Sequence, residues 1–313
     1  MPVISEAMRS VEALATEQAS VVSRTQAYAA GLSRGVVRAQ VRARRWQVIG
    51  CHSICLHNGP LSEQSLHWAA VIEAGPRAML DGATALVAGG LSGYTTERIR
   101  VSVPRGARIR HRGSGVDIRQ TRRWASNDLA PTGVPRTRPA VAAIRAALWA
   151  RSDKQAALLL TMTAQQGLAT PEQMGVEMLR VRRHRRRGFV HQVLLDLIGG
   201  VRAVSELEFA RECRSRGLPE PTRQVVRKGA NGSYFLDVVW EEWNVVTEID
   251  GIHHTWAANL VTDALRHNDL TLTDATVLRL PLLGLRVAAD EFFAQIEAAL
   301  RAAGWSGRLP TAV

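Results

Sequence analysis

Residues 234–254 read YFLDVVWEEWNVVTEIDGIHH. β-Branched and aromatic residues flank an acidic centre, a pattern that predicts two short strands joined as a hairpin. Asp237 lies inside the first strand, and Glu248 and Asp250 lie at the end of the second. A buried carboxylate without a partner costs several kcal/mol, so three acids in one hairpin indicate a bound metal ion. The alternative interpretation is a surface hairpin whose acids are solvated.

The pairing of the two strands decides whether these acids meet. A turn at Glu241 and Glu242 predicts that Asp237 pairs with Val246, which makes Asp237 and Glu248 diagonal neighbours on one face. Diagonal neighbours lie roughly 7–8 Å apart. Two carboxylates at that range can close on one cation with metal–oxygen distances of about 2–2.5 Å. A four-residue loop would preserve this facing, whereas a three-residue loop would break it.

The residues after the hairpin extend the predicted site. Asp250 continues on the same face, and Gly251 permits a sharp turn toward His253 and His254. Oxygen ligands favour Mg²⁺ or Mn²⁺ over zinc. A hard cation beside a histidine suits phosphodiester hydrolysis, because the cation stabilises charge on the phosphate and the histidine transfers a proton.

Composition and charge restrict the class of protein. A chain of 313 residues is long enough for two or three domains, and a hydrophobic content of 46% is typical of a globular protein. No apolar run approaches the length of a membrane span, the first residues do not resemble an export signal, and three cysteines are too few for a disulfide framework. These features predict a cytoplasmic protein. Residues 201–313 hold 12 basic against 15 acidic residues, so the net charge of +12 comes from the first 200 residues, as expected if they bind a polyanion.

The basic N-terminal part contains the pattern of a helix-turn-helix. Two helical segments flank a turn at Gly31, Ser33 is a natural N-cap, and residues 46–56 could form a wing hairpin. The second helix predicts one basic stripe that contacts DNA, and its members are Arg34, Arg38, Arg42 and Arg45. The alternative is a solvated arginine face on an ordinary helical subdomain.

Residues 61–200 have an α/β pattern. Residues 77–88 predict one helix of this region, and Thr170 as a cap with Pro171 in the first turn predicts the start of another.

A second basic run lies toward the end of this region. Residues 179–188 read LRVRRHRRRG. A run this basic can clamp phosphates without reading sequence, or it can be a solvated helix face before a domain junction. The phosphate-clamp interpretation assigns DNA contacts to Arg182, Arg183 and Arg186.

Two helices flank the acidic hairpin in the sequence. Ser205 and Glu208 have the spacing of a capping box, which leaves Glu206 on the inward face as a further candidate acid. After the hairpin, residues 263–270 predict a helix in which Asp263 and Arg266 can form a salt bridge, or Arg266 can face the site.

These segments resemble a known bacterial domain, filed as domain of unknown function 559 and similar to the very-short-patch-repair (Vsr) endonucleases. The resemblance covers roughly residues 203–304 and implies the PD-(D/E)XK restriction-endonuclease-like superfamily. An N-terminal winged helix similar to AbiEi-type antitoxins often precedes such a domain, and residues 20–60 are compatible with one. The resemblance rests on Glu206, YFLD (234–237), TEIDGIHH (247–254), DALRHN (263–268) and VLRLP (277–281).

The resemblance also implies roles for individual residues. Asp237 matches the metal-binding aspartate of the superfamily, Glu248 its second acidic position, His254 the Vsr-like histidine, and Glu206 the helix acid. One departure stands out, because Asp250 occupies the place of the superfamily's lysine. Without that lysine, the resemblance leaves activation of the attacking water to His254 or a second metal ion, with Lys228 as a distant substitute.

We therefore expect an α/β (α+β) protein with three domains. These are a winged helix-turn-helix at 1–60, a small α/β domain with a basic helical end at 61–200, and a Vsr-like mixed sheet flanked by helices at 201–313. The expected function is that of a Mg²⁺- or Mn²⁺-dependent endonuclease acting on double-stranded DNA, with no membrane and with a homodimer as one option. The alternatives are a regulator or antitoxin-like DNA-binding protein with an inactive nuclease fold, and an RNA-processing nuclease.

Overall fold

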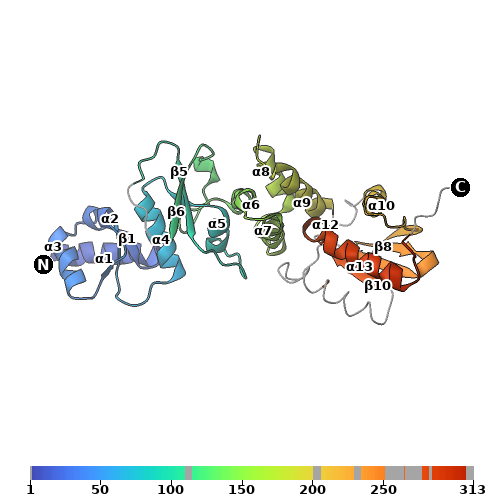
Figure 1. Cartoon of the computed structure of the whole chain (residues 1–313). Helices are drawn as coiled ribbons and strands as arrows, with labels where there is room; N and C mark the ends of the chain where they lie inside the picture. Colours follow the sequence, from blue (N-terminus) through green and yellow to red (C-terminus); the bar gives the residue numbers. More distant parts are fainter. Residues whose placement is uncertain are drawn as a thin grey trace. The chain divides into compact units, whose positions relative to one another are not determined.

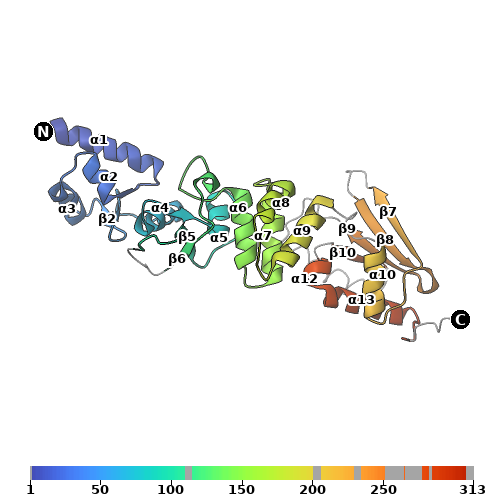
Figure 2. The same cartoon turned by 90° about the horizontal axis from the view of Figure 1, so that it is seen from above.

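The computed structural model describes residues 2–109, 115–199, 206–228, 234–250, 264, 277–281 and 284–307 (Figures 1 and 2). For residues 2–5, 199, 206–208, 223–228, 234–237 and 250 this description covers the backbone alone. The chain combines helices with small sheets, so it belongs to the mixed α and β class. It divides into two compact units, Met1–Ala146 and Ala147–Val313. The domain boundaries expected near residues 60 and 200 lie inside these units.

The first unit begins with helices packed on a three-stranded sheet of order β1-β3-β2, in which both pairs are antiparallel. The elements are α1 (Pro2–Glu17), β1 (Val21–Ser23), α2 (Arg24–Ala29), α3 (Arg34–Arg42), β2 (Gln47–Val48) and β3 (Ser53–Cys55). Their shared core contains the fully buried residues Val11, Val22, Ala27, Val37 and Ile54. The expected helix pair and the following hairpin are therefore present.

Local sequence explains where α2 and α3 begin. The Ser23 hydroxyl accepts a hydrogen bond from the Gln26 amide at 3.0 Å, and the Gln26 side chain accepts one from the Ser23 amide at 2.7 Å, which forms a capping box. The Ser33 hydroxyl accepts from the Val36 amide at 3.3 Å, which confirms the expected N-cap of α3. Between the helices, Gly31 has φ of +96°, a conformation that glycine adopts without a steric penalty.

A second sheet of order β4-β5-β6 completes the unit, with β4 antiparallel and β6 parallel to β5. Its elements are α4 (Glu63–Ala74), β4 (Met79–Leu80), α5 (Gly82–Ala88), β5 (Ile99–Pro104), β6 (Val116–Thr121), the 3-10 turn η1 (Ser126–Asp128) and α6 (Pro139–Trp149), which runs into the second unit. A single helix over residues 77–88 was expected, and that expectation is wrong. Met79 and Leu80 pair with β5, and the Asp81 carboxylate caps a new helix by accepting from the Gly82 amide at 2.8 Å.

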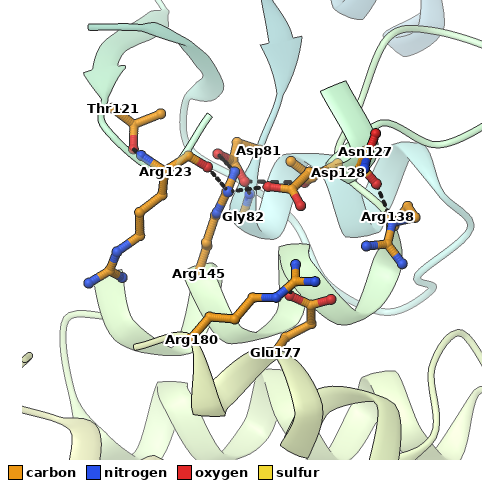
Figure 3. A network of polar contacts seen from close by, with 11 residues as sticks. Asp81, Gly82, Thr121, Arg123, Asn127, Asp128, Arg138, Arg145, Glu177 and Arg180 are labelled. Carbon is orange, nitrogen blue, oxygen red and sulfur yellow. Dashed lines mark hydrogen bonds and ion pairs between the residues drawn. The ribbon is translucent and has the colours of Figure 1, made fainter. Parts of the chain in front are cut away.

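One buried arginine ties this sheet to α6 (Figure 3). The Arg145 guanidinium is 6% exposed and donates to Asp81 Oδ2 at 2.9 Å and to Asp128 Oδ2 at 2.6 Å. It also donates to the Arg123 carbonyl oxygen, and the Thr137 hydroxyl donates to Asp81 at 3.1 Å. Two buried carboxylates therefore share one guanidinium, whose positive charge lies between them.

The second unit begins with three helices after α6. They are α7 (Asp153–Gln165), α8 (Pro171–Leu179) and α9 (Arg187–Gly199). Thr170 and Gln173 form a capping box and Pro171 occupies the first turn of α8, which confirms that expected helix start. On α9, Asp196 is 2% exposed and accepts two hydrogen bonds from Arg286 at 2.7 and 3.2 Å, so an ion pair fastens this layer to the C-terminal elements.

The C-terminal elements form a four-stranded sheet of order β10-β9-β8-β7 (Figure 2). Strands β7, β8 and β9 are successively antiparallel, whereas β10 is parallel to β9. The elements are α10 (Glu206–Ser215), β7 (Arg223–Lys228), β8 (Tyr234–Trp240), the 3-10 turn η3 (Glu241–Trp243), β9 (Val245–Asp250), β10 (Val277–Pro281), α12 (Gly284–Val287) and α13 (Ala289–Ala302).

One face of this sheet packs against α10 and α13. The Phe209 ring of α10 lies 6.4 Å from the Trp240 ring of β8 and 5.5 Å from the Phe293 ring of α13, measured between centroids. Alternate strand residues, among them Val238, Val245, Ile249 and Leu280, are fully buried on this face. Helix α13 begins at Ala289, and Asp290 lies in its first turn, where an acid complements the helix dipole.

Among the described residues, no helix is long and apolar enough to cross a membrane.

Candidate functional site

Helix α3 presents a basic face. The side chains of Arg34, Arg38 and Arg42 recur every four residues and are exposed, while Val37 on the other side is fully buried. No described residue forms an ion pair with Arg38 or Arg42. The Arg34 guanidinium lies 5.9 Å from the centroid of the Tyr28 ring, which orients it. The guanidinium groups are thus available to an external anion.

Arg45 differs from the other members of the predicted stripe. It follows the end of α3, and its side chain is exposed but donates to Gln40 Oε1 at 2.6 Å. That hydrogen bond is to a neutral amide, and no described carboxylate forms an ion pair with Arg45.

The β2–β3 hairpin is fixed beside the helix pair by a glutamate that sequence reasoning missed. One carboxylate oxygen of Glu73, on α4, accepts hydrogen bonds of 2.7 Å from the His52 amide, the Ser53 amide and the Ser53 hydroxyl. Gly50 lies so close to Glu73 that a Cβ atom there would be 2.5 Å from the carboxylate. Glu73 therefore fixes the hairpin to α4. Because Glu73 lies about 20 residues after the hairpin, no local sequence pattern predicts this contact.

The second basic run divides into two groups. Arg182 and Arg183 are exposed, as a phosphate contact requires. Arg186, which was assigned to DNA, is only 7% exposed, donates to Asp153 Oδ1 at 2.7 Å and to the Ala150 carbonyl oxygen, and so joins two helices. The assignment of Arg186 to DNA contact is therefore wrong, because its guanidinium is already used inside the unit.

The acidic hairpin has a different register from the expected one. The loop contains four residues, Glu241–Asn244, because η3 is followed by Asn244 in the left-handed conformation with φ of +50°. Trp240 therefore pairs with Val245, and Asp237 pairs with Glu248 and not with Val246. Directly opposite residues on antiparallel strands lie on one face with Cα atoms about 4.5–5.5 Å apart. The expected diagonal pair is thus replaced by a closer, direct pair of positions.

The face that carries these positions is the one opposite α10 and α13. The Glu248 side chain is 41% exposed, and Val277 on the neighbouring strand is 39% exposed. Asp250 follows Glu248 by two residues, so by strand alternation it falls on the same face. A direct pair of acidic positions on an open face has the oxygen donors that a hard divalent cation requires.

Arg279 is a further residue at this site that the sequence patterns did not reveal. Strand β10 runs parallel to β9 and places Arg279 opposite Glu248. Its Nε lies 3.7 Å from Glu248 Oε2, and its side chain is 65% exposed. A positive charge therefore stands beside the acid pair, although Asp250 occupies the position where a lysine was expected.

Several predicted site residues lie outside the described residues. This applies to Gly251, His254, Asp263 and Arg266, and to the side chains of Glu206, Asp237 and Asp250. Among the side chains that are described, no group of three or more His, Cys, Asp or Glu residues could hold a metal ion. Glu248 is the one predicted metal ligand whose side chain is described.

The buried cysteines add no nucleophile to the site. Burial raises the pKa of the Cys213 thiol to about 12, and burial also raises the pKa of Cys55. Both side chains therefore remain protonated thiols at neutral pH.

Comparisons with known proteins leave the chain without a family. No family model matches it, and no curated protein matches it. Among solved structures, the crystal structure of the RV2827C protein from Mycobacterium tuberculosis is similar to it with 19% sequence identity and a TM-score of 0.39. That similarity covers 66% of this chain and 81% of the other.

Proposed function

We propose that this protein is a metal-dependent endonuclease that docks on double-stranded DNA with its first unit and cuts with its C-terminal sheet. The observation that carries the proposal is the direct pairing of Asp237 with Glu248 on the open face of the sheet. Two adjacent carboxylates repel each other unless a proton or a cation lies between them. An Mg²⁺ or Mn²⁺ ion is the partner that this donor set fits best.

The sheet also supports the expected relationship to restriction endonucleases. A helix followed by three antiparallel strands, with a fourth strand parallel to the third, is compatible with the mixed sheet that the resemblance implies. Asp237 and Glu248 would hold the cation. When bound, the cation would neutralise charge on the scissile phosphate. Arg279 would contribute a second positive charge at the phosphate, and His254 would transfer a proton to or from the reacting oxygen atoms.

The first unit supports docking on DNA. Its order of helix, strand, two helices and two strands, with the sheet order β1-β3-β2, is the arrangement expected of a winged helix-turn-helix. Helix α3 is the element that such a module places in the major groove, and its exposed arginines suit phosphate and guanine contacts. Arg182 and Arg183 would add sequence-independent phosphate contacts. A cytoplasmic setting remains part of this proposal.

Cleavage of supercoiled plasmid DNA tests the proposal. With Mg²⁺ or Mn²⁺ the full chain is expected to nick or linearise the plasmid. Asp237→Asn and Glu248→Gln are expected to reduce the rate by about 100-fold or more, as for removal of a metal ligand. Glu242→Gln is the matched control, since Glu242 is an exposed acid of the same hairpin loop. Equal cleavage by all four proteins would assign the activity to a contaminant and refute the proposal.

One observation favours a second candidate, a DNA-binding regulator or antitoxin-like protein whose nuclease fold is inactive. Asp250 adds a third acid where the resemblance requires a lysine, so no lysine of that motif activates water. On this candidate, the chain binds a specific DNA fragment, such as its own promoter, with the same affinity in EDTA and in Mn²⁺. Absence of cleavage by the wild-type chain together with such binding would select this candidate over the endonuclease.

A further inference from the structure

A pocket of about 700 Å³ lies within the first unit, and its lining residues do not include the arginines of α3. Three segments form its walls. Helix α2 and the β2–β3 hairpin contribute Gln26 and His52, α4 and the chain after it contribute Trp68 and Arg77, and the chain between β6 and α6 contributes Trp124 and Leu129. Its volume is that of a site for a small organic molecule.

The walls of the pocket are held by interactions that lie behind them. Arg145 donates to the carbonyl oxygen of Arg123 and to Asp128, the residues that immediately precede Trp124 and Leu129 (Figure 3). Gln26 is fixed by the capping box of α2, and the His52 backbone is fixed by Glu73. The pocket is thus organised before any ligand binds, which lowers the entropic cost of binding.

The chemistry of the lining indicates the class of ligand. Trp68 and Trp124 offer flat apolar surfaces, which favour an aromatic ring. The Arg77 side chain is exposed at the pocket and forms no ion pair with any described residue. An arginine in this position favours a carboxylate or another anionic group.

We propose that this pocket binds a small aromatic acid. Its ring system lies against the tryptophans, and its anionic group pairs with Arg77. Since α2 and the β2–β3 hairpin form one wall, an occupied pocket would also be thermodynamically linked to DNA binding. That link rests on the proposed function, whereas binding of the acid does not.

Ligand binding by the full chain in the absence of DNA and metal tests the proposal. The probes are 2-naphthoate and its uncharged analogue 2-naphthamide, followed by saturation-transfer NMR and by titration of tryptophan fluorescence. The wild-type chain is expected to bind 2-naphthoate saturably with Kd below about 1 mM, and 2-naphthamide at least several-fold more weakly. Arg77→Gln should weaken 2-naphthoate binding about tenfold and leave 2-naphthamide binding unchanged.

Two further variants separate the pocket from general effects. Trp124→Ala removes one of the two aromatic surfaces of the pocket, so it should weaken both probes. Arg105→Gln removes an exposed arginine outside the pocket and should bind both probes as the wild type does. Each variant is compared at an unchanged melting temperature; if Trp124→Ala unfolds the unit, Arg77→Gln decides alone. Failure of the wild type to bind 2-naphthoate, or equal binding by Arg77→Gln and Arg105→Gln, overturns the proposal.

Discussion

Helix α3 presents its arginines singly to solvent, whereas strands β8 and β9 place carboxylate positions opposite each other. The arginines of α3 are exposed, so solvent screens the repulsion between their charges. Asp237 and Glu248 are neighbours because two strands pair in one register, and their like charges need compensation. On the proposed function, the first arrangement is the surface for a polyanion and the second is the site for a cation.

Other charged residues show what happens when compensation comes from the chain itself. Arg145 and Arg186 are buried and paired, and so are the acids Asp81 and Asp196. Their charges are used to hold elements together and are not available to a ligand. The charge of these buried pairs is thus structural, in contrast to the exposed charge of α3 and of the hairpin.

The largest expected effect concerns structural charge. Arg145→Met leaves Asp81 and Asp128 buried without their cation, and breaking a buried pair in this way costs about 3–5 kcal/mol. Thermal and urea denaturation followed by circular dichroism should show the first unit unfolding early, with a later transition from the second unit. Arg105→Met, which removes an exposed arginine of the same unit, should leave both transitions unchanged.

The next effect concerns the arginines of α3. Replacing Arg34, Arg38 and Arg42 together by glutamine should weaken binding to a 30-base-pair duplex by about tenfold or more at physiological salt. The slope of log affinity against log salt should fall by roughly 0.9 for each phosphate that the variant no longer neutralises. Arg214→Gln is the control, since Arg214 is exposed but already paired with Glu220 at 2.5 Å. An unchanged salt slope in the triple variant would exclude α3 from the DNA interface.

The smallest effect concerns pH. His67 on α4 is 2% exposed, and burial lowers its pKa below the ordinary 6.5, although the nearby Glu63 carboxylate opposes this. The unfolded chain then binds more protons than the folded chain just below pH 6.5, so the stability of the first unit falls as the pH drops through that range and is constant above it. In His67→Gln this part of the pH dependence should disappear from urea denaturation measured between pH 5 and 7.5. A histidine substitution at exposed Gln64 controls for added imidazole, and should add little pH dependence.

The sequence was sufficient for features that depend on neighbouring residues. The caps at Ser33 and Thr170 and the spacing of the arginines on α3 each follow from residues within one segment. The same reasoning placed acids on the two strands of the hairpin. Strand parity fixed which residues share a face, because a shift of the register by two residues preserves that facing.

Features that depend on distant residues could not be predicted in the same way. The register of β8 and β9 followed from the left-handed Asn244, which lengthened the loop and moved the partner of Asp237 to Glu248. Arg279 lies at the site because β10 pairs in parallel with β9. Arg186 is buried because it pairs with Asp153, which lies 33 residues earlier in the chain. Each of these depends on tertiary contact, which a local pattern does not contain.

Titration of Mn²⁺ by isothermal calorimetry tests most directly whether the paired acids form a metal site. The wild-type chain is expected to bind Mn²⁺ saturably without DNA, and Glu242→Gln should bind it equally well. Glu248→Ala should bind Mn²⁺ at least tenfold more weakly, because it removes one of the two opposed carboxylates. A wild-type chain that binds no divalent cation, or a Glu248→Ala variant that binds as tightly as the wild type, would contradict the account.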